Sequence, residues 1–165
     1  MCYAYFASGC FWCITPAFQM LPGVRSVTSG YSGGDEENPT YLEVKNQKTG
    51  HRETVRVEYN PEKISYRQLL RTFLQNVDPF DGGGQFIDRG FSYTLAVYYE
   101  TEEQKAAARE CIRQLEAESG RRVCIALEAF KRFWEAEEYH QDYHRKNPEA
   151  FRRELIESGR VKQLN

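Results

Sequence analysis

Apolar positions along the first third of the chain switch between a strand pattern and a helix pattern. Residues 3–6 form a short apolar run that predicts a strand. Apolar side chains then recur at helical spacing, which predicts a helix with the buried residues Phe11, Ile14, Phe18 and Leu21. Pro16 interrupts this helix, so we expect an irregular start with Thr15 as the cap. Pro22-Gly23 ends the helix, and residues 24–31 predict a second strand.

The same alternation continues along the rest of the chain. Residues 53–59 alternate apolar and polar side chains, which predicts a half-buried third strand. Ser65 followed by Gln68 forms a capping-box pattern, and it opens a helix with the apolar stripe Leu69, Leu70, Phe73 and Val77. The remaining predicted elements are a strand at 93–99, a helix at 101–119 that ends at Gly120, and a strand at 123–126.

Two polar segments separate these elements. Residues 35–48 are rich in turn formers, and residues 78–92 form a long loop with many glycines. Long loops inside compact domains are usually functional. The order β-α-β-β-α-β matches the split βαβ plan. We therefore predict one α+β domain over residues 1–165, a ferredoxin-like sandwich with an additional helix and a long C-terminal segment.

Composition and charge narrow the functional classes. A length of 165 residues is enough to bury a core, and 14% aromatic residues can fill it. The net charge of −2 argues against nucleic acid as a partner, and no apolar run approaches a membrane span. The five cysteines are odd in number and unevenly spread, unlike a secreted disulfide framework. We therefore expect a cytoplasmic protein that binds neither nucleic acid nor a membrane.

The segment Gly9-Cys10-Phe11-Trp12-Cys13 carries the strongest chemical signal. Cys10 and Cys13 lie one helical turn apart at a helix start, where a thiol pKa falls and a disulfide can close. The aromatic pair Phe11 and Trp12 can form the rim of an apolar pocket. A buried, inert Cys10 with core aromatics is the simpler interpretation, but a second thiol and a preceding glycine favour redox chemistry. A zinc site would need a second pair of ligands at matching spacing, and we expect no metal.

Further motifs follow in a fixed order along the chain. They are Gly30-Tyr31-Ser32-Gly33-Gly34, Asn38-Pro39-Thr40-Tyr41, Thr49-Gly50-His51-Arg52-Glu53, Asp78-Pro79, then Gln85, Asp88, Gly90 and Tyr93, and finally Ala136-Glu137-Glu138-Tyr139-His140-Gln141. Together with the cysteine segment, their order and spacing resemble the peptide methionine-S-sulfoxide reductases of the A-type family. The resemblance covers nearly the whole chain. It implies stereospecific reduction of methionine-S-sulfoxide and repair of oxidised proteins.

This resemblance implies a role for each matching residue. Cys10 would attack the sulfoxide sulfur as a thiolate. Glu53 would protonate the sulfoxide oxygen, which requires that burial keep its carboxyl neutral near neutral pH. The remaining matches are Tyr41 and Tyr93 as hydrogen-bond donors to the oxygen, Asp88 as a holder of that oxygen's network through water, and Phe11 and Trp12 as the pocket for the substrate methyl group.

The recycling step departs from the family pattern. Reduction leaves a sulfenic acid on Cys10, which a second thiol converts to a disulfide. Many members carry that second cysteine where this chain has Lys45, and many carry another near the C-terminus, where this chain has none after Tyr143. We expect Cys13, one turn from Cys10, to form the disulfide, which thioredoxin or a similar dithiol would reopen. Cys2, on the strand that leads to the site, stays open as an alternative.

The expected partners are methionine sulfoxide, free or in proteins, and a dithiol reductant. We expect no cofactor, and we expect the protein to be a monomer.

A thioredoxin-like thiol-disulfide oxidoreductase is the alternative enzyme, with Asn38-Pro39 as the loop proline facing the cysteines. A metal- or peptide-binding module is the non-catalytic alternative, since His140 and His144 are four residues apart with Glu137 nearby. A solvated helix face explains that cluster better.

Overall fold

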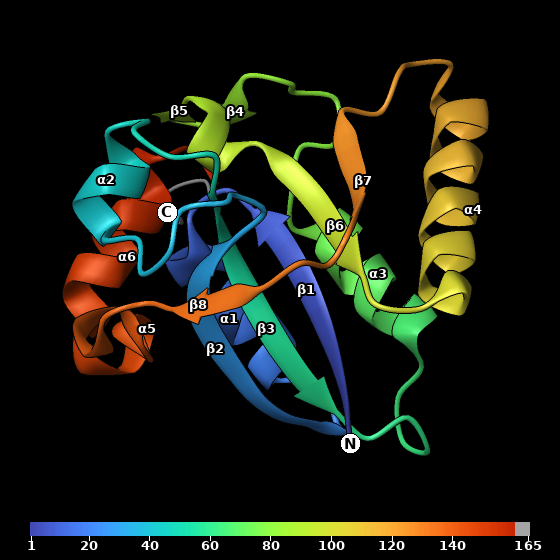
Figure 1. Ribbon diagram of the computed structural model, residues 1–165, viewed down its shortest axis with the longest axis horizontal. Coiled ribbons are helices and arrows are strands. Elements are labelled where there is room, and N and C mark those ends of the chain that lie inside the picture. Colours follow the sequence, from blue (N-terminus) through green and yellow to red (C-terminus); the bar gives the residue numbers. More distant parts are fainter. Residues whose placement is uncertain (161–165) are drawn as a thin grey trace.

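The main sheet has six strands and runs through the middle of the protein (Figure 1). The computed structural model describes residues 1–160. The strands are β1 (Cys2–Ser8), β2 (Val24–Ser32), β3 (Arg52–Tyr59), β6 (Leu95–Tyr99), β7 (Ile125–Ala129) and β8 (Phe133–Glu135). Their order is β7-β6-β1-β3-β2-β8. Neighbouring strands are antiparallel except β6 and β7, which are parallel. The fold is therefore mixed α/β.

Helices cover one face of this sheet and build the main core. They are α1 (Phe11–Gln19), α3 (Tyr66–Gln75) and α4 (Glu102–Ser119). Strand side chains alternate between faces, so Phe6 of β1 points at the helices. Its ring lies 5.3 Å from that of Phe18 and 5.1 Å from that of Phe73, between centroids. This aromatic stack holds the last turn of α1 and the helix α3 against β1.

The chain between β7 and β8 covers the opposite face, where it crosses in front of β1 and β6 (Figure 1). Phe130 stacks on Tyr5 with 4.0 Å between ring centroids.

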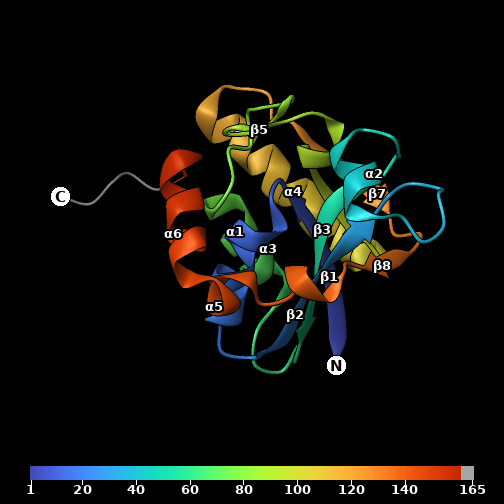
Figure 2. The ribbon, with the colours of Figure 1, turned by 90° about the vertical axis from the view of Figure 1, so that its left-hand side faces the viewer.

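The shorter elements are α2 (Tyr41–Lys45), β4 (Gly84–Gln85), β5 (Asp88–Arg89), the 3₁₀ turns η1 (Phe91–Tyr93) and η2 (Glu138–His140), α5 (Tyr143–Lys146) and α6 (Pro148–Glu157). Figure 2 shows α6 along the outer side of α1. Among the helices of residues 1–160, none has the length and apolar character needed to span a bilayer.

The structure confirms the predicted strands and the capped helices. Ser65 and Gln68 form both bonds of the capping box, and the Thr101 side chain accepts from the Gln104 backbone N–H at the start of α4. Gly120 ends α4 in the left-handed region at φ +68°, where glycine is favoured.

The predicted start of the first helix is wrong. Cys10, not Thr15, is the N-cap residue, and Pro16 lies inside α1. Thr15 Oγ1 instead donates to the Phe11 carbonyl at 2.7 Å. Burial of the apolar stripe holds the helix together although the proline removes one backbone hydrogen bond. The thiol is therefore placed at the helix N-terminus.

The sequence patterns did not predict several short elements, among them α2, β8, α5 and α6. The helix α2 has only five residues, too few for a visible period, and β8, α5 and α6 lie in a segment of mixed aromatic and charged residues. Tyr93 lies in a 3₁₀ turn before β6, not in the predicted strand. The interpretation of His140 and His144 as partners on one helix is wrong, because Asp142 at φ +51° separates η2 from α5.

Candidate active site

A sharp turn places Cys10 at the N-terminus of α1. Gly9 has φ +84°, and a Cβ atom there would lie 2.7 Å from the Cβ atom of Gln85, so both conformation and space require glycine. The Cys10 side chain is 6% exposed. The positive end of the helix dipole lies at this position. The prediction of a lowered thiol pKa at Cys10 is nevertheless wrong, because a hydrogen bond with Cys13 and burial raise this pKa well above its ordinary value.

A cavity of about 190 Å³ opens next to this thiol. It is lined by Cys10, Phe11, Trp12, Tyr41, Lys45, Glu53, Asp88, Tyr93 and Glu154. The fold thus brings together every residue that the sequence proposed for the site except Cys13, from separate segments between Cys10 and Tyr93. Lys45 and Glu154 are lining residues for which the sequence suggested no role.

Glu53 is a buried carboxyl group that faces the cavity. The strand alternation of β3 places it on the same face as Val55, toward the helices, and its exposure is 1%. Oε1 of Glu53 accepts a hydrogen bond from the Phe11 backbone N–H at 3.2 Å. Burial raises its pKa to about 8, and the charge of Asp88 adds to this, while the Phe11 N–H and Tyr93 oppose it. Glu53 is therefore a neutral acid near pH 7.

Two phenols face the same cavity. Tyr41 begins α2 and Tyr93 ends η1. Burial raises the pKa of both hydroxyls far above the ordinary value, and the nearby Glu53 contributes to each shift. Both phenols therefore remain protonated and can donate hydrogen bonds to an oxygen atom in the cavity.

Asp88 reaches the cavity from the short hairpin of β4 and β5. Its Oδ2 atom is buried and has no hydrogen-bond partner among residues 1–160. Burial raises the pKa of Asp88, against the charges of Arg160 and Lys45. Gln85 fixes the loop, because its side chain accepts from the Asp78 N–H and donates to the Asp78 carbonyl, both at 2.8 Å. An unpaired buried acceptor at this point fits a ligand or water that donates to it.

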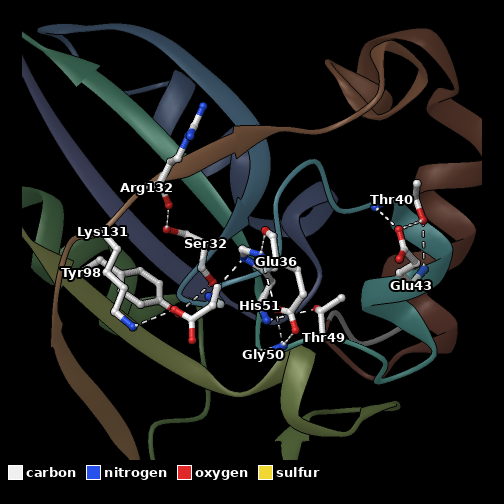
Figure 3. A network of polar contacts seen from close by, with 12 residues as sticks. Ser32, Glu36, Thr40, Glu43, Thr49, Gly50, His51, Tyr98, Lys131 and Arg132 are labelled. Carbon is white, nitrogen blue, oxygen red and sulfur yellow. Dashed lines mark hydrogen bonds and ion pairs between the residues drawn. The ribbon is translucent and has the colours of Figure 1, made fainter.

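The loop between β2 and β3 is held at both ends (Figure 3). His51 is buried there: its Nδ1 accepts from the Gly34 backbone N–H at 3.2 Å, and its Nε2 bonds the Glu36 carbonyl at 2.8 Å. This arrangement makes Nε2 the protonated nitrogen. Because the loop ends are tied together, Tyr41 in the loop and Glu53 after it remain beside one cavity.

Glu137 anchors Tyr41 from the C-terminal segment. One carboxylate oxygen accepts from the Tyr31 hydroxyl at 2.8 Å, and the other accepts from the Tyr41 backbone N–H at 3.0 Å. Burial alone would raise the pKa of Glu137, but these hydrogen bonds outweigh it and the pKa falls. Glu137 is therefore an ionised link between β2 and α2.

His140 supports Trp12 behind the cavity. Its Nδ1 accepts from the Trp12 indole N–H at 3.1 Å, and its ring centroid lies 4.3 Å from that of Tyr41. Burial lowers the pKa of His140 to about 4, so the ring is neutral. No group of three or more His, Cys, Asp and Glu side chains within residues 1–160 is arranged to hold a metal ion.

Cys13 faces a different cavity from Cys10. It lines a groove of about 370 Å³ together with Met20, Phe86 and Arg160, among others. A hydrogen bond between the two thiols, together with burial, raises the pKa of Cys10, and the same bond lowers the pKa of Cys13, with Arg160 contributing. Both are free thiols. The two sulfurs of the CxxC pair thus lie next to each other, but the two residues line different cavities.

Comparison with known families decides the identity of this site. Residues 2–165 match the family described as peptide methionine sulfoxide reductase. The chain belongs to this family. It is therefore an oxidoreductase that reduces methionine sulfoxide.

Individual relatives agree with this assignment. The chain is 46% identical to the peptide methionine sulfoxide reductase MsrA of Bacillus velezensis over 95% of this chain and 90% of the relative. Reduced Mxr1 of Saccharomyces cerevisiae superposes with a TM-score of 0.84 at 27% identity, over 90% of this chain and 86% of Mxr1. Mxr1 in complex with Trx2 has the same fold, with a TM-score of 0.57 at 16% identity, over 86% of this chain and 84% of Mxr1.

The sequence indicates the C-terminal motif of this reductase, but it does not show what the residues of that motif do. Glu137 and His140 lie in a matching motif, but the sequence interpretation placed them in a solvated face or a weak metal pair. Their partners Tyr31, Tyr41 and Trp12 are 96 to 128 positions away, so no local pattern reveals them. The match to the family motif was the signal that could have identified these two residues as part of the site.

The Glu137 link has a measurable effect on stability. Tyr31→Phe removes the donor to a carboxylate that has another partner, and we expect the free energy of unfolding to fall by about 1–3 kcal/mol. Urea denaturation would measure this loss. Tyr139→Phe, at an exposed tyrosine in the same region, is the matched control with little expected change. Equal stability of the two variants would contradict a structural role for the Tyr31–Glu137 bond.

Proposed function

We propose that Cys10 reduces methionine-S-sulfoxide with Glu53 as the acid. The observation that carries the proposal is the pairing of a thiol at a helix N-terminus with a buried carboxyl of raised pKa in one cavity. A sulfoxide oxygen is a poor leaving group until it is protonated. A carboxyl with a pKa of about 8 still holds its proton at pH 7, where an ordinary glutamate has lost it.

The first step balances without an external reductant. The Cys10 sulfur attacks the sulfoxide sulfur, Glu53 protonates the oxygen, and the oxygen passes to Cys10. Cys10 becomes a sulfenic acid through a two-electron oxidation, and the sulfoxide is reduced to the thioether. The proton of the original thiol restores Glu53.

The other lining residues hold the substrate during this step. Tyr41 and Tyr93 donate hydrogen bonds to the oxygen, and Asp88 accepts from its network through water. Phe11 and Trp12 receive the methyl group on the sulfur. Because two of the three substituents of a chiral sulfur are fixed in this way, only one diastereomer presents its third substituent toward the cavity opening.

Recycling is assigned to Cys13. Its thiol attacks the Cys10 sulfenic acid, forms the Cys10–Cys13 disulfide and releases water. A dithiol then reduces this disulfide by two successive exchanges. The yeast relative Mxr1, solved in complex with Trx2, supports thioredoxin or a similar protein as that dithiol.

The wider assignment covers the substrates, the location, the oligomeric state, the domain and the fold. The enzyme repairs oxidised proteins and also reduces the free amino acid, and it acts in the cytoplasm as a monomer. Residues 1–165 form one domain, of which 161–165 lie outside the described residues. The central strands β6, β1, β3 and β2 follow the ferredoxin-like split βαβ plan. The antiparallel pairing of these four strands supports that plan.

The function is tested with the two separated sulfoxide diastereomers and dithiothreitol as reductant. We expect turnover of methionine-S-sulfoxide and very slow turnover of the R form. Equal rates on both would contradict the proposed pocket. Reduction of insulin disulfides without any sulfoxide turnover would favour the thioredoxin-like alternative.

A further inference from the structure

Two opposite charges line the substrate cavity and take no part in the proposed reaction. Lys45 is the last residue of α2, and Glu154 lies in α6, so they reach the cavity from separate elements. Within residues 1–160, no side-chain ion pair involves either one. The Lys45 ammonium lies 5.6 Å from the centroid of the Tyr41 ring. A cation and an anion are thus available to a ligand in the same cavity as Cys10.

The electrostatic surroundings of Glu154 favour a cationic ligand. Burial and the charge of Asp88 raise the pKa of its carboxyl, and the charges of Lys45 and Arg160 oppose this rise. A partly buried carboxylate without an ion pair is stabilised when an ammonium group binds to it. The charge of Lys45 acts on the carboxyl groups of both Asp88 and Glu154. Lys45 and Glu154 therefore belong to one region of the cavity.

The charges of free methionine sulfoxide match this pair. Its ammonium and carboxylate are attached to one carbon atom, which two methylene groups separate from the sulfur. With the sulfur at Cys10 and the methyl group between Phe11 and Trp12, this carbon extends toward the opposite wall. In a peptide, the amino and carboxyl groups of the same residue form neutral amides. Binding of a peptide therefore does not require Lys45 and Glu154.

We propose that Lys45 binds the α-carboxylate and Glu154 the α-ammonium of free methionine-S-sulfoxide. This inference rests on the proposed function and adds a substrate class to it. The free amino acid is bound through both main-chain charges, whereas a residue inside a protein is bound through the sulfoxide end alone.

Four forms of the substrate separate the two contacts. They are free methionine-S-sulfoxide, its N-acetyl derivative, its amide, and the N-acetyl amide that carries neither charge. For the free amino acid, Lys45→Met and Glu154→Gln should each lower kcat/KM roughly 5- to 10-fold. Lys45→Met should slow the N-acetyl acid but not the amide, and Glu154→Gln should do the reverse. The N-acetyl amide should react equally well with all three proteins.

Matched controls complete this experiment. Lys48→Met and Glu149→Gln change exposed residues of the same types on the same helix or the loop next to it, and neither residue lines the cavity. Both should leave all four rates unchanged. If the Lys45 and Glu154 variants slow the doubly blocked substrate as much as the free amino acid, or slow none, the assignment is overturned. Failure of the wild-type enzyme on every S-sulfoxide would instead contradict the proposed function.

Discussion

Glu53→Gln is expected to lower kcat by about 10²–10⁴-fold while KM changes little. Glutamine keeps the shape of the side chain and can still accept the hydrogen bond from the Phe11 N–H, but it has no proton to transfer. The substitution removes only the proton transfer to the sulfoxide oxygen, which occurs after the substrate has bound. Substrate binding should therefore be retained. Steady-state kinetics on methionine-S-sulfoxide with dithiothreitol would measure both constants.

The pH profile distinguishes an acid from a structural residue. The wild-type rate should fall as pH rises through about 8, because Glu53 then loses the proton that the reaction uses. The residual rate of Glu53→Gln should lack this decline. Glu58→Gln is the matched control, since Glu58 lies near the other end of β3, where it pairs with Arg25 at 3.5 Å. A near-normal kcat in Glu53→Gln would shift the acid role to Asp88.

Cys13→Ser is expected to retain the first chemical step and lose recycling. The variant should reduce one equivalent of methionine-S-sulfoxide and accumulate a sulfenic acid on Cys10, since serine cannot attack it. Turnover with thioredoxin should fall at least about tenfold, whereas small thiols that reach Cys10 directly should restore part of it. A sulfenic-acid probe with mass spectrometry would quantify the intermediate.

Cys111→Ser provides the control for this experiment. Cys111 lies in α4 and packs against the main core, and it lines neither the cavity of Cys10 nor the groove of Cys13. Its removal should leave thioredoxin-dependent turnover unchanged. A Cys13→Ser enzyme that turns over normally with thioredoxin would show that another cysteine, or none, resolves the sulfenic acid.

Regular elements of this fold were predictable because their signals are local. The alternation of β3 predicted the strand, and with it the face on which Glu53 lies with Val55 and Val57. Ser65 and Gln68 predicted a helix start from the identity of two residues. The alternation of a strand and the cap of a helix depend on residues that are close together in the sequence. The sequence alone is therefore sufficient to predict these segments.

The composition of the cavity depended on contacts between distant segments. The sequence marks Lys45 only as the place of a missing cysteine, and it gives no signal for Glu154, because α6 reaches the cavity by packing beside α1. The anchoring of Tyr41 by Glu137 likewise joins segments 96 positions apart. Helical spacing placed Cys13 near Cys10 but could not reveal that it opens into a different groove.

The most direct test of the mechanism is peptide mapping after a single turnover. Reduced protein receives one equivalent of methionine-S-sulfoxide without any external reductant, and its thiols are then blocked and mapped by mass spectrometry. We predict a disulfide between Cys10 and Cys13 as the main product. A bridge from Cys10 to Cys2, Cys111 or Cys124, or an unbridged Cys10, would contradict this mechanism.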